Sequence, residues 1–346
     1  MKTTIHAFWW RKGHVLSFVL WPFSRLYGAI AGRRMRRAKG ASVSVPVLCV
    51  GNFTVGGTGK TPVAEALAKA AIAAGRKPGF VLRGYGAKVT SARLVDPERH
   101  THADVGDEAL MLSRTAPAAV SPARVDAAEL LVSEGVDFII MDDGLQSGRL
   151  RPDFTVAVVD ARRGFGNGLC LPAGPLRAPL AAQFPKADVV LLNGEGPGAA
   201  DVAAVARQAH VPVERFSQKP AGDEADRLAG RHVLAYAGIG DPDKFFDTLE
   251  GLGAIVAERV RLADHEAITP ARARNLVARA NADALSPVTT AKDMARLSGA
   301  TDSDLAALRA LSAVLEITAV FEDPLMPDCL VSAAADAFKR RDGRSA

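Results

Sequence analysis

The sequence predicts an α/β protein in which a parallel β-sheet carries helices on both faces. Short apolar runs typical of buried strands alternate with helix-like stretches, and this alternation is typical of parallel sheets. The length of 346 residues is enough for about two domains. We expect an N-terminal helical segment over residues 1–40, a larger α/β domain over 41–222 and a smaller α/β domain over 223–346.

The hydrophobic pattern sets the positions of the expected elements. The expected strands are Val47–Val50, Pro78–Leu82, Phe138–Met141, Phe154–Val159, Val189–Leu192, His232–Ala237 and Val314–Phe321. The expected helices are Pro62–Ala74, Asp107–Ser113, Arg124–Glu134, Asp241–Leu252 and Asp328–Phe338. Polar sequence with glycine and proline over Gln218–Asp226 indicates a linker between the two domains.

The first strand leads into a glycine-rich loop that has the pattern of a phosphate-binding P-loop. The loop and the start of its helix consist of Thr54, Val55, Gly56, Gly57, Thr58, Gly59, Lys60 and Thr61. Backbone N–H groups of such a loop attract phosphate, the lysine reaches the β- and γ-phosphates, and the hydroxyl ligates Mg²⁺. The sequence therefore predicts a P-loop nucleotide-binding sheet. Thr54 departs from the usual motif, which has glycine there, and a glycine-rich turn without a ligand is the alternative.

Two acids, Asp142 and Asp143, follow the expected strand Phe138–Met141. A carboxylate at this strand end holds Mg²⁺ in P-loop enzymes, directly or through water. An acidic pair alone is more often a turn, but the P-loop upstream favours the metal role. Gln146, in the same loop, either contacts a phosphate or the acceptor, or serves the loop itself. Asn193, at another strand end, either contacts the base or forms a plain turn.

Asp107 and Glu108 begin an expected helix, where acids are favoured for helix stability alone. The functional interpretation is that Asp107 is a general base that takes a proton from an acceptor hydroxyl. His265 follows Asp264 in the second domain, and it would form an acid–base dyad with Asp107 if the two met across the domain cleft. The sequence by itself does not determine that approach.

Loops with arginine, glycine or lysine offer further candidate ligand contacts. They are Arg83-Gly84-Tyr85-Gly86, Phe165–Gly168 with Leu171–Arg177, and Thr290-Ala291-Lys292-Asp293. Glycine lets the backbone approach a ligand, and the guanidinium of Arg83 or Arg177 matches a phosphate. The alternative for each is a tight loop without a ligand.

Charge and cysteine usage limit the classes of partner and compartment. The net charge is +5, yet the first 64 residues hold ten Lys or Arg and no acid, since Glu65 is the first. A basic arm on a mildly acidic body indicates an anionic surface as partner. The apolar content of the arm favours a membrane, and no nucleic acid is expected. Three scattered cysteines form no disulfide framework or zinc spacing, which suits a reducing compartment.

The arm contains an apolar and aromatic stretch over 15–32, flanked by Arg and Lys. Its apolar residues recur at helical spacing, and tryptophans suit the headgroup level of a bilayer. The stretch is short for a spanning helix, and the basic cluster after it argues against an exported signal peptide. A helix lying in the membrane interface fits best. A spanning helix, or a helix packed on the protein's own core, is the alternative.

The motifs, in this order, closely resemble those of the tetraacyldisaccharide 4′-kinases of lipid A synthesis. The shared pattern covers most of the chain: the basic apolar N-terminus, Gly-Asn before Thr-Val-Gly-Gly-Thr-Gly-Lys-Thr-Pro, Arg-Gly-Tyr-Gly, Val-Gly-Asp-Glu, Asp-Asp-Gly-Leu-Gln, Leu-Pro-Ala-Gly-Pro-Leu-Arg, Asp-His and Thr-x-Lys-Asp. No single motif is decisive, but the combination is specific. Thr54 agrees with this family's own loop. Ala178 departs from it, because the family commonly has glutamate there.

The resemblance implies phosphoryl transfer from MgATP to the 4′-hydroxyl of a tetraacylated glucosamine disaccharide 1-phosphate lipid. It also implies work at the cytoplasmic face of the inner membrane of a Gram-negative bacterium. By matching position, Asp107 would be the base paired with His265, and Lys60 would stabilise charge on the transferred phosphate. Metal ligands would be Thr61 and the Asp142/Asp143 pair, and site support would come from Gln146 and Arg177.

A rival interpretation is a membrane-associated P-loop ATPase switch that transfers phosphate only to water. Related loops of such switches read Lys-Gly-Gly-x-Gly-Lys-Thr, whereas Val55 stands here in the place of the first lysine. A nucleotide-binding structural module without turnover is a third possibility. In that case the Asp107 and His265 motifs would be accidental.

Overall fold

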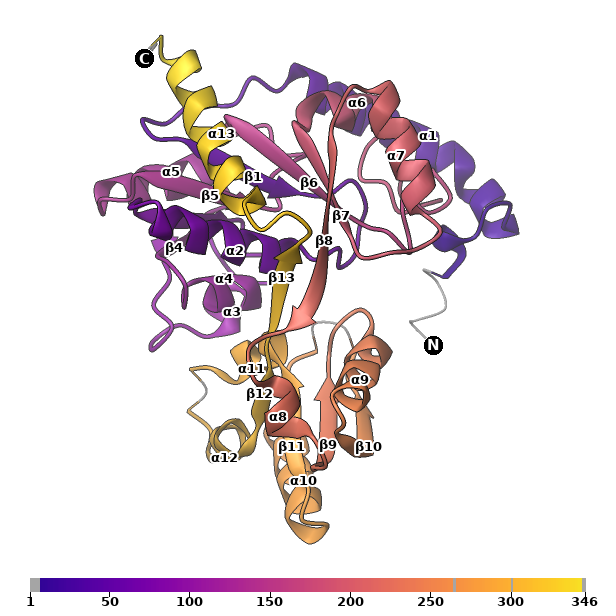
Figure 1. Ribbon diagram of the computed structural model, residues 1–346, viewed down its shortest axis with the longest axis vertical. Coiled ribbons are helices and arrows are strands. Elements are labelled where there is room, and N and C mark those ends of the chain that lie inside the picture. Colours follow the sequence, from indigo (N-terminus) through magenta and orange to yellow (C-terminus); the bar gives the residue numbers. More distant parts are fainter. Residues whose placement is uncertain (1–6, 264–265, 300, 344–346) are drawn as a thin grey trace.

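The computed structural model describes residues 7–263, 266–299 and 301–343. Within these residues the strands form a nine-stranded and a four-stranded sheet, in an upper and a lower part of the molecule (Figure 1). The order in the large sheet is β13-β8-β7-β6-β1-β5-β2-β4-β3. The edge strands β13 and β3 pair antiparallel, and the strands between them pair in parallel. The predicted α/β P-loop fold is confirmed.

The elements of the large sheet and its covering helices have the following bounds. The strands are β1 Val47–Gly51, β2 Pro78–Leu82, β3 Arg93–Leu94, β4 Ala118–Val120, β5 Phe138–Asp142, β6 Phe154–Asp160, β7 Val189–Asn193, β8 Val213–Pro220 and β13 Ile317–Phe321. The helices are η1 Ala7–Trp10, α1 Val15–Arg37, α2 Lys60–Ala73, α3 His102–Val105, α4 Asp107–Leu112, α5 Arg124–Ser133, α6 Leu180–Gln183, η2 Phe184–Lys186, α7 Ala199–Gln208 and α13 Met326–Arg341.

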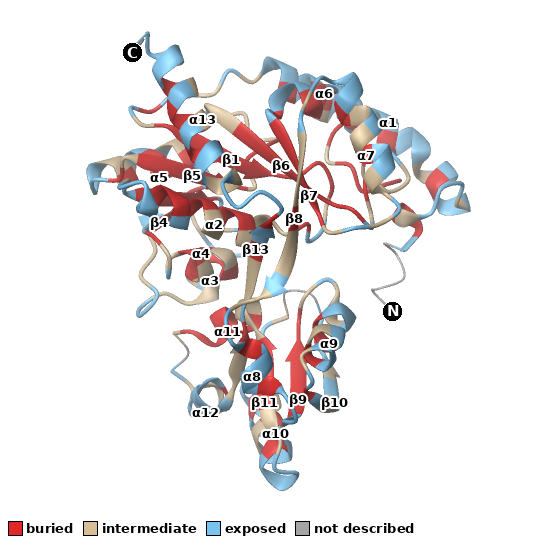
Figure 2. Ribbon diagram, viewed as in Figure 1, coloured by how far each residue is buried: buried red, intermediate tan, exposed pale blue. Residues whose placement is uncertain are grey.

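The central parallel strands β1, β2, β5, β6 and β7 are buried on both faces, as Figure 2 shows by their colour, whereas β8 near the edge is mostly half-buried. In β1, Leu48 and Val50 pack into one cluster with residues of α2, α4 and α13. Val47 and Cys49 point to the opposite face and pack with α5. Side chains alternate along a strand, so covering both faces requires apolar residues at consecutive positions. This explains the continuous apolar runs in the sequence.

The four-stranded sheet forms the core of the lower part, with the order β10-β9-β11-β12 and parallel pairing. Its strands are β9 His232–Ala237, β10 Ile255–Arg261, β11 Ser286–Thr290 and β12 Ala313–Leu315. Its helices are α8 Glu224–Leu228, α9 Pro242–Gly251, α10 Pro270–Ala282, α11 Ala291–Leu297 and α12 Ser303–Leu311. Apolar side chains of β9 alternate between two clusters, one on each face of this sheet.

The chain crosses between the two parts twice, and the crossings differ from the sequence expectation. The expected strand Val314–Phe321 is two strands, β12 in the small sheet and β13 in the large one. The break falls at Glu316, whose carbonyl accepts a 2.9 Å hydrogen bond from the Ala221 N–H in the other crossing. The expected linker Gln218–Asp226 is mostly ordered, because β8 and α8 extend into it.

The C-terminal segment also lies elsewhere than the range 223–346 suggested. After Glu316, β13 pairs with β8 at the edge of the large sheet, and Leu330, Val331 and Ala334 of α13 pack into its core. The apolar pattern alone cannot assign a strand to one of two sheets. The structural unit around the small sheet therefore ends near residue 316.

Candidate active site

The glycine loop connects β1 to α2 in the P-loop arrangement that the sequence predicts. Gly59 precedes the first helical residue, Lys60, with a left-handed φ of 96°. A Cβ at Gly59 would lie 2.8 Å from Nδ2 of Asn193, so glycine is required there both by conformation and by space. Asn193 donates to the Thr58 carbonyl and to Gln218 Oε1, both at 3.0 Å. The Asn193 amide thus braces the loop from β7.

Thr54 owes its place to the loop that contains Leu171–Arg177. It is buried and forms an antiparallel bridge with Leu176, while the Val55 N–H donates to the Pro175 carbonyl at 2.9 Å. The Arg177 N–H donates to the Phe53 carbonyl at 3.0 Å. The start of the P-loop is therefore extended and paired, and such a position does not require glycine.

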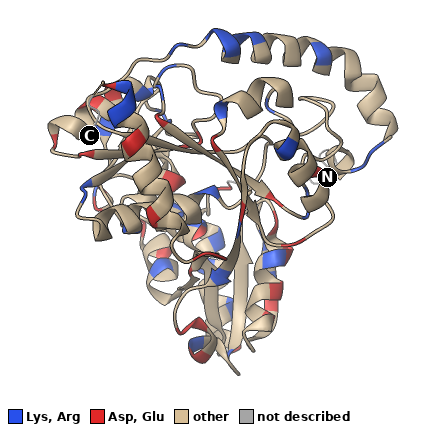
Figure 3. Ribbon diagram, turned by 45° about the horizontal axis from the view of Figure 1, so that its top comes forward, with Lys and Arg blue, Asp and Glu red and all other residues tan. Residues whose placement is uncertain are grey.

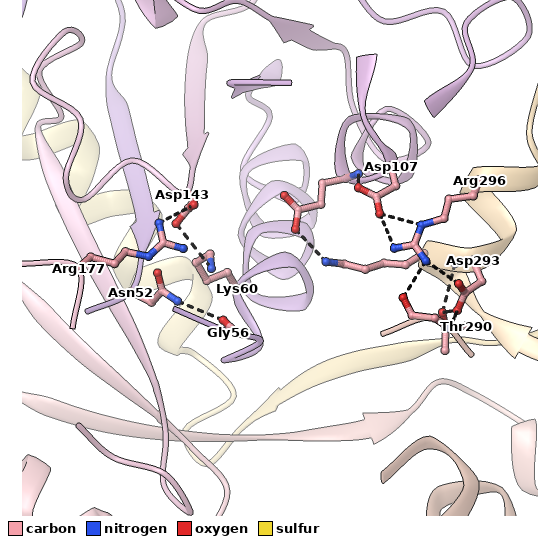
Figure 4. Close-up of polar contacts among 12 residues, drawn as sticks. Asn52, Gly56, Lys60, Asp107, Asp143, Arg177, Thr290, Asp293 and Arg296 are labelled. Atoms are coloured by element: carbon pink, nitrogen blue, oxygen red, sulfur yellow. Dashed lines mark hydrogen bonds and ion pairs between the residues drawn. The ribbon is translucent and has the colours of Figure 1, made fainter. Parts of the chain in front are cut away.

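Asp143 follows β5 and lies between two cations (Figure 4). Its Oδ1 is 3.6 Å from Lys60 Nζ, and its Oδ2 accepts a 2.8 Å hydrogen bond from Arg177 Nη1. Burial by itself would raise the pKa of Asp143, but Lys60 and Arg177 outweigh it and hold that pKa well below its usual range. Asp143 is consequently an ionised carboxylate that positions both cations.

Asp142, the last residue of β5, has a different environment. It is 2% exposed, and within the described chain neither carboxylate oxygen has a hydrogen-bond partner. Burial, followed by the negative charge of Glu108, raises the pKa of Asp142 to about 7, although Lys60 lowers it. A buried carboxylate without a partner is costly in an apolar interior. These orphaned oxygens fit a cation ligand.

The backbone of the acidic pair is held by Arg124, the first residue of α5. Its Nη2 donates to the backbone carbonyl of Asp143 at 2.9 Å. Burial lowers the pKa of Arg124, and the charge of Asp143 opposes that shift. Arg124 is not predictable from the sequence, because an arginine at a helix start carries no signal for a buried role.

Asp107 begins α4 and is buried against the second domain. Its Oδ2 accepts hydrogen bonds from Nη2 and Nε of Arg296 in α11, at 2.7 and 3.2 Å. Next to Asp107, Glu108 forms a 2.8 Å ion pair with Lys292, which belongs to α11 like Arg296. His265, the predicted partner of Asp107, lies outside the described residues, so the proposed dyad stays a prediction.

The acids of α4 lie near Asp142. The charge of Glu108 raises the pKa of Asp142, and the charge of its ion-pair partner Lys292 lowers it. The Arg83–Gly86 loop lies beside them, because a Cβ at Gly106 would be 3.0 Å from the Tyr85 carbonyl oxygen. Arg83 itself is exposed. Among the described residues, those predicted in both domains thus gather at one end of the large sheet, where its parallel strands end.

Two predicted contact residues are already engaged within the protein. Gln146 Nε2 donates to the Asn52 carbonyl at 2.7 Å and to Gln183 Oε1 at 2.6 Å. Arg177 holds Asp143 and also donates from Nε to the Thr54 carbonyl at 3.3 Å. These contacts favour supporting roles. Ala178, where the resembled family has glutamate, is fully buried and contributes no charge.

The comparison with known proteins decides the family. The family model described as tetraacyldisaccharide-1-P 4′-kinase (LpxK) matches residues 16–333. The chain belongs to the tetraacyldisaccharide 4′-kinase family. Membership confirms the family and the kinase class that the motifs indicated.

Similar proteins cover nearly the whole length of this family member. A tetraacyldisaccharide 4′-kinase of Allorhizobium ampelinum is 47% identical over 98% of this chain and 99% of its own. The Brucella ovis enzyme of that name is also 47% identical, over 99% of both chains. A crystal structure of LpxK from Aquifex aeolicus in complex with ATP has a TM-score of 0.71 at 23% identity, covering 93% of this chain and 100% of that one. At that identity the likeness supports the fold.

Proposed function

We propose that this protein transfers the γ-phosphate of MgATP to the 4′-hydroxyl of a tetraacylated glucosamine disaccharide 1-phosphate, a step of lipid A biosynthesis. The main structural support for this proposal is the arrangement of two acidic centres in the site. A P-loop with an unpartnered buried carboxylate, Asp142, lies beside a second acidic centre at Asp107, and the second domain covers that centre. The first centre suits the nucleotide, and the second suits activation of an acceptor. Family membership supports the choice of acceptor.

The P-loop N–H groups bind the phosphates, and Lys60 stabilises charge on the transferred group. Thr61, Asp142 and Asp143 are the candidate residues for holding Mg²⁺. Because Asp143 is already paired with Lys60 and Arg177, Asp142 is the better direct ligand. When bound, Mg²⁺ supplies neutralisation of charge on the β- and γ-phosphates. Within the described chain no cluster of three metal-binding side chains exists, which suits an ion held mainly by phosphates and water.

Asp107 takes the proton of the acceptor hydroxyl in this mechanism, with His265 as its predicted partner. Arg83 is exposed directly after β2 and is available for a phosphate of the lipid headgroup. Gln146 and Arg177 keep the surrounding loops in place. The paired crossings near residues 221 and 316 form a natural hinge on which the second domain closes and excludes water.

We further propose that α1 lies in the cytoplasmic interface of the inner membrane. The helix attaches to the protein mainly through serine and glycine, with Met35 near its end, and most of its large apolar residues face outward. The buried residues are Ser17, Ser24, Gly28, Gly32 and Met35. The exposed apolar residues are Val15, Leu16, Phe18, Val19, Trp21, Phe23, Leu26, Tyr27 and Ile30.

This polarity is the reverse of a helix that packs on its own protein's core. Basic residues lie along α1 and are concentrated in its last turn (Figure 3), where they suit anionic headgroups. The helix is long and apolar enough to cross a membrane by length and composition, which is weak evidence alone. Its contacts with the protein run from Ser17 to Met35, nearly its whole length. Such contacts favour a helix lying on the membrane over one that leaves the protein to span it.

The proposed activity is tested by incubating the purified chain with γ-labelled ATP, Mg²⁺ and the acylated disaccharide 1-phosphate in mixed micelles. We expect label in the lipid, and little free phosphate without lipid. Release of free phosphate at the same rate with and without lipid would instead establish the ATPase switch. A Lys60→Ala chain serves as the control for contaminating kinases.

A further inference from the structure

One contact between the two domains is made by a buried arginine that neither the P-loop chemistry nor the lipid contact uses. Arg296 in α11 has a side chain only 2% exposed and reaches Asp107 of the first domain, whose side chain is 9% exposed. A buried guanidinium is stable only when its charge is compensated and its donors are bonded. Figure 4 shows Arg296 between Asp107 on one side and Asp293 on the other.

The second domain holds this guanidinium in a defined orientation. Arg296 Nη1 donates to Asp293 Oδ1 at 2.6 Å and to the Gly238 carbonyl at 2.8 Å. Asp293, fully buried, is itself held through Oδ2 by the Gly238 N–H at 3.0 Å and the Thr290 hydroxyl at 2.7 Å. Gly238 has no room for a side chain, because a Cβ there would lie 2.9 Å from Asp293 Oδ1 and 3.1 Å from Arg296 Nη1.

The other edge of the guanidinium, Nε and Nη2, is directed at a single oxygen of Asp107. The second oxygen, Oδ1, accepts the N–H of Glu108 at 3.0 Å. The described contacts therefore hold both oxygens of the carboxylate, Oδ1 from its own helix and Oδ2 from the other domain. A lysine has no planar fork and cannot bond Asp293, Gly238 and Asp107 with the same geometry.

We propose that Arg296 is a positioning residue for the phosphoryl transfer: fixed by Asp293 and Gly238, it orients Asp107, so that the site is complete only when the second domain is docked. The ion pair of Lys292 with Glu108 joins the same two helices and supports the same docking. The Thr290–Asp293 motif thereby has a structural role: Thr290 holds Asp293, and Asp293 holds Arg296. The inference rests on the proposed role of Asp107.

The test compares Arg296→Ala, Arg296→Lys and Gly238→Ala with wild type in the lipid kinase assay, with ATP affinity measured separately by calorimetry. We expect kcat to fall about 100-fold in all three, the scale expected when a catalytic group is misplaced by about 1 Å. The KM for ATP should stay near its wild-type value, because the P-loop belongs to the other domain. Arg274→Ala, which breaks an exposed ion pair with Asp304 on the second domain, is the matched control and should keep the wild-type kcat.

Rescue separates positioning from a merely structural role. Guanidinium ion in solution should recover part of kcat in Arg296→Ala and none in Asp107→Ala. Wild-type kcat in Arg296→Ala, or full activity in Arg296→Lys, would overturn the proposal. If Arg296→Ala does not fold, the kcat of Arg296→Lys and Gly238→Ala decides by the same criterion. Failure of the wild-type chain to label the lipid would instead contradict the proposed function.

Discussion

The Nζ atom of Lys60 lies 3.6 Å from Oδ1 of Asp143, which joins the first residue of α2 to the end of β5. A fixed carboxylate therefore holds the P-loop lysine, which we propose stabilises charge on the transferred phosphate. Preorganised charge of this kind stabilises a transition state without reorganisation at the moment of reaction.

Lys60→Ala should reduce lipid phosphorylation by roughly 100- to 1,000-fold, the range found when one transition-state donor is removed. The fold should persist, because Arg177 still pairs with Asp143. The measurement is kcat together with a thermal melt. Lys69→Ala, at an exposed position of the same helix, is the control and should be as active as wild type. Equal activity of Lys60→Ala and wild type would remove Lys60 from the mechanism.

Asp107→Ala should abolish transfer to lipid while ATP binding persists, because the P-loop does not contain Asp107. Calorimetric titration with a non-hydrolysable ATP analogue checks binding, and label transfer checks chemistry. Near-normal turnover in Asp107→Ala would exclude it as the base. A chain that loses ATP binding as well would point to a role in stability.

Asp142→Asn should stabilise the metal-free protein at pH 8 and have little effect near pH 4. The folded-state pKa of Asp142, about 7, lies above its ordinary value of 3.8. The protonated form of Asp142 stabilises the fold, so this contribution to the free energy of unfolding is complete below the ordinary pKa and is lost as the pH rises through about 7. Asparagine keeps the neutral form at every pH. Thermal melts in chelator at the two pH values give the comparison, and a lower melting temperature for Asp142→Asn at pH 8 would contradict the assignment.

The same substitution should weaken Mg²⁺ binding in the presence of the ATP analogue. Protons compete with the metal for Asp142 below about pH 7, so wild-type affinity should rise between pH 6 and pH 8. Asp142→Asn should show a weaker affinity and a flatter pH dependence. An unchanged affinity in that chain would move the metal contact to Asp143 or Thr61.

Phe18→Glu with Phe23→Glu should release the protein from anionic vesicles, since these side chains are 70% and 64% exposed on α1. Cosedimentation measures the loss, and deletion of residues 1–38 should have the same effect. Ile255→Glu, at an exposed apolar residue of the second domain, is the matched control and should still bind. A deleted chain that still sediments with vesicles would contradict the anchor.

The local chemistry of the site was predictable from sequence because it depends on short-range patterns. A glycine loop between a strand and a helix makes a phosphate cradle wherever the strand is placed, and acids after an apolar strand lie at the sheet edge. This is why Lys60, Asp142 and Asp143 were found together. Most strands agreed within a residue or two, since strands buried on both faces read as continuous apolar runs.

Only the tertiary structure decided how distant segments meet. Arg296 is three positions after Asp293 on a helix, a spacing that brings the two side chains together but says nothing of Asp107, almost two hundred residues away. The division of Val314–Phe321 between two sheets is likewise invisible in an apolar run. By itself the sequence determined the phosphate cradle and the basic apolar arm, because both depend on neighbouring residues. The docking of the domains, the separate states of Asp142 and Asp143, and the outward apolar face of α1 depend on burial and charge from remote segments, and the folded chain alone supplies these.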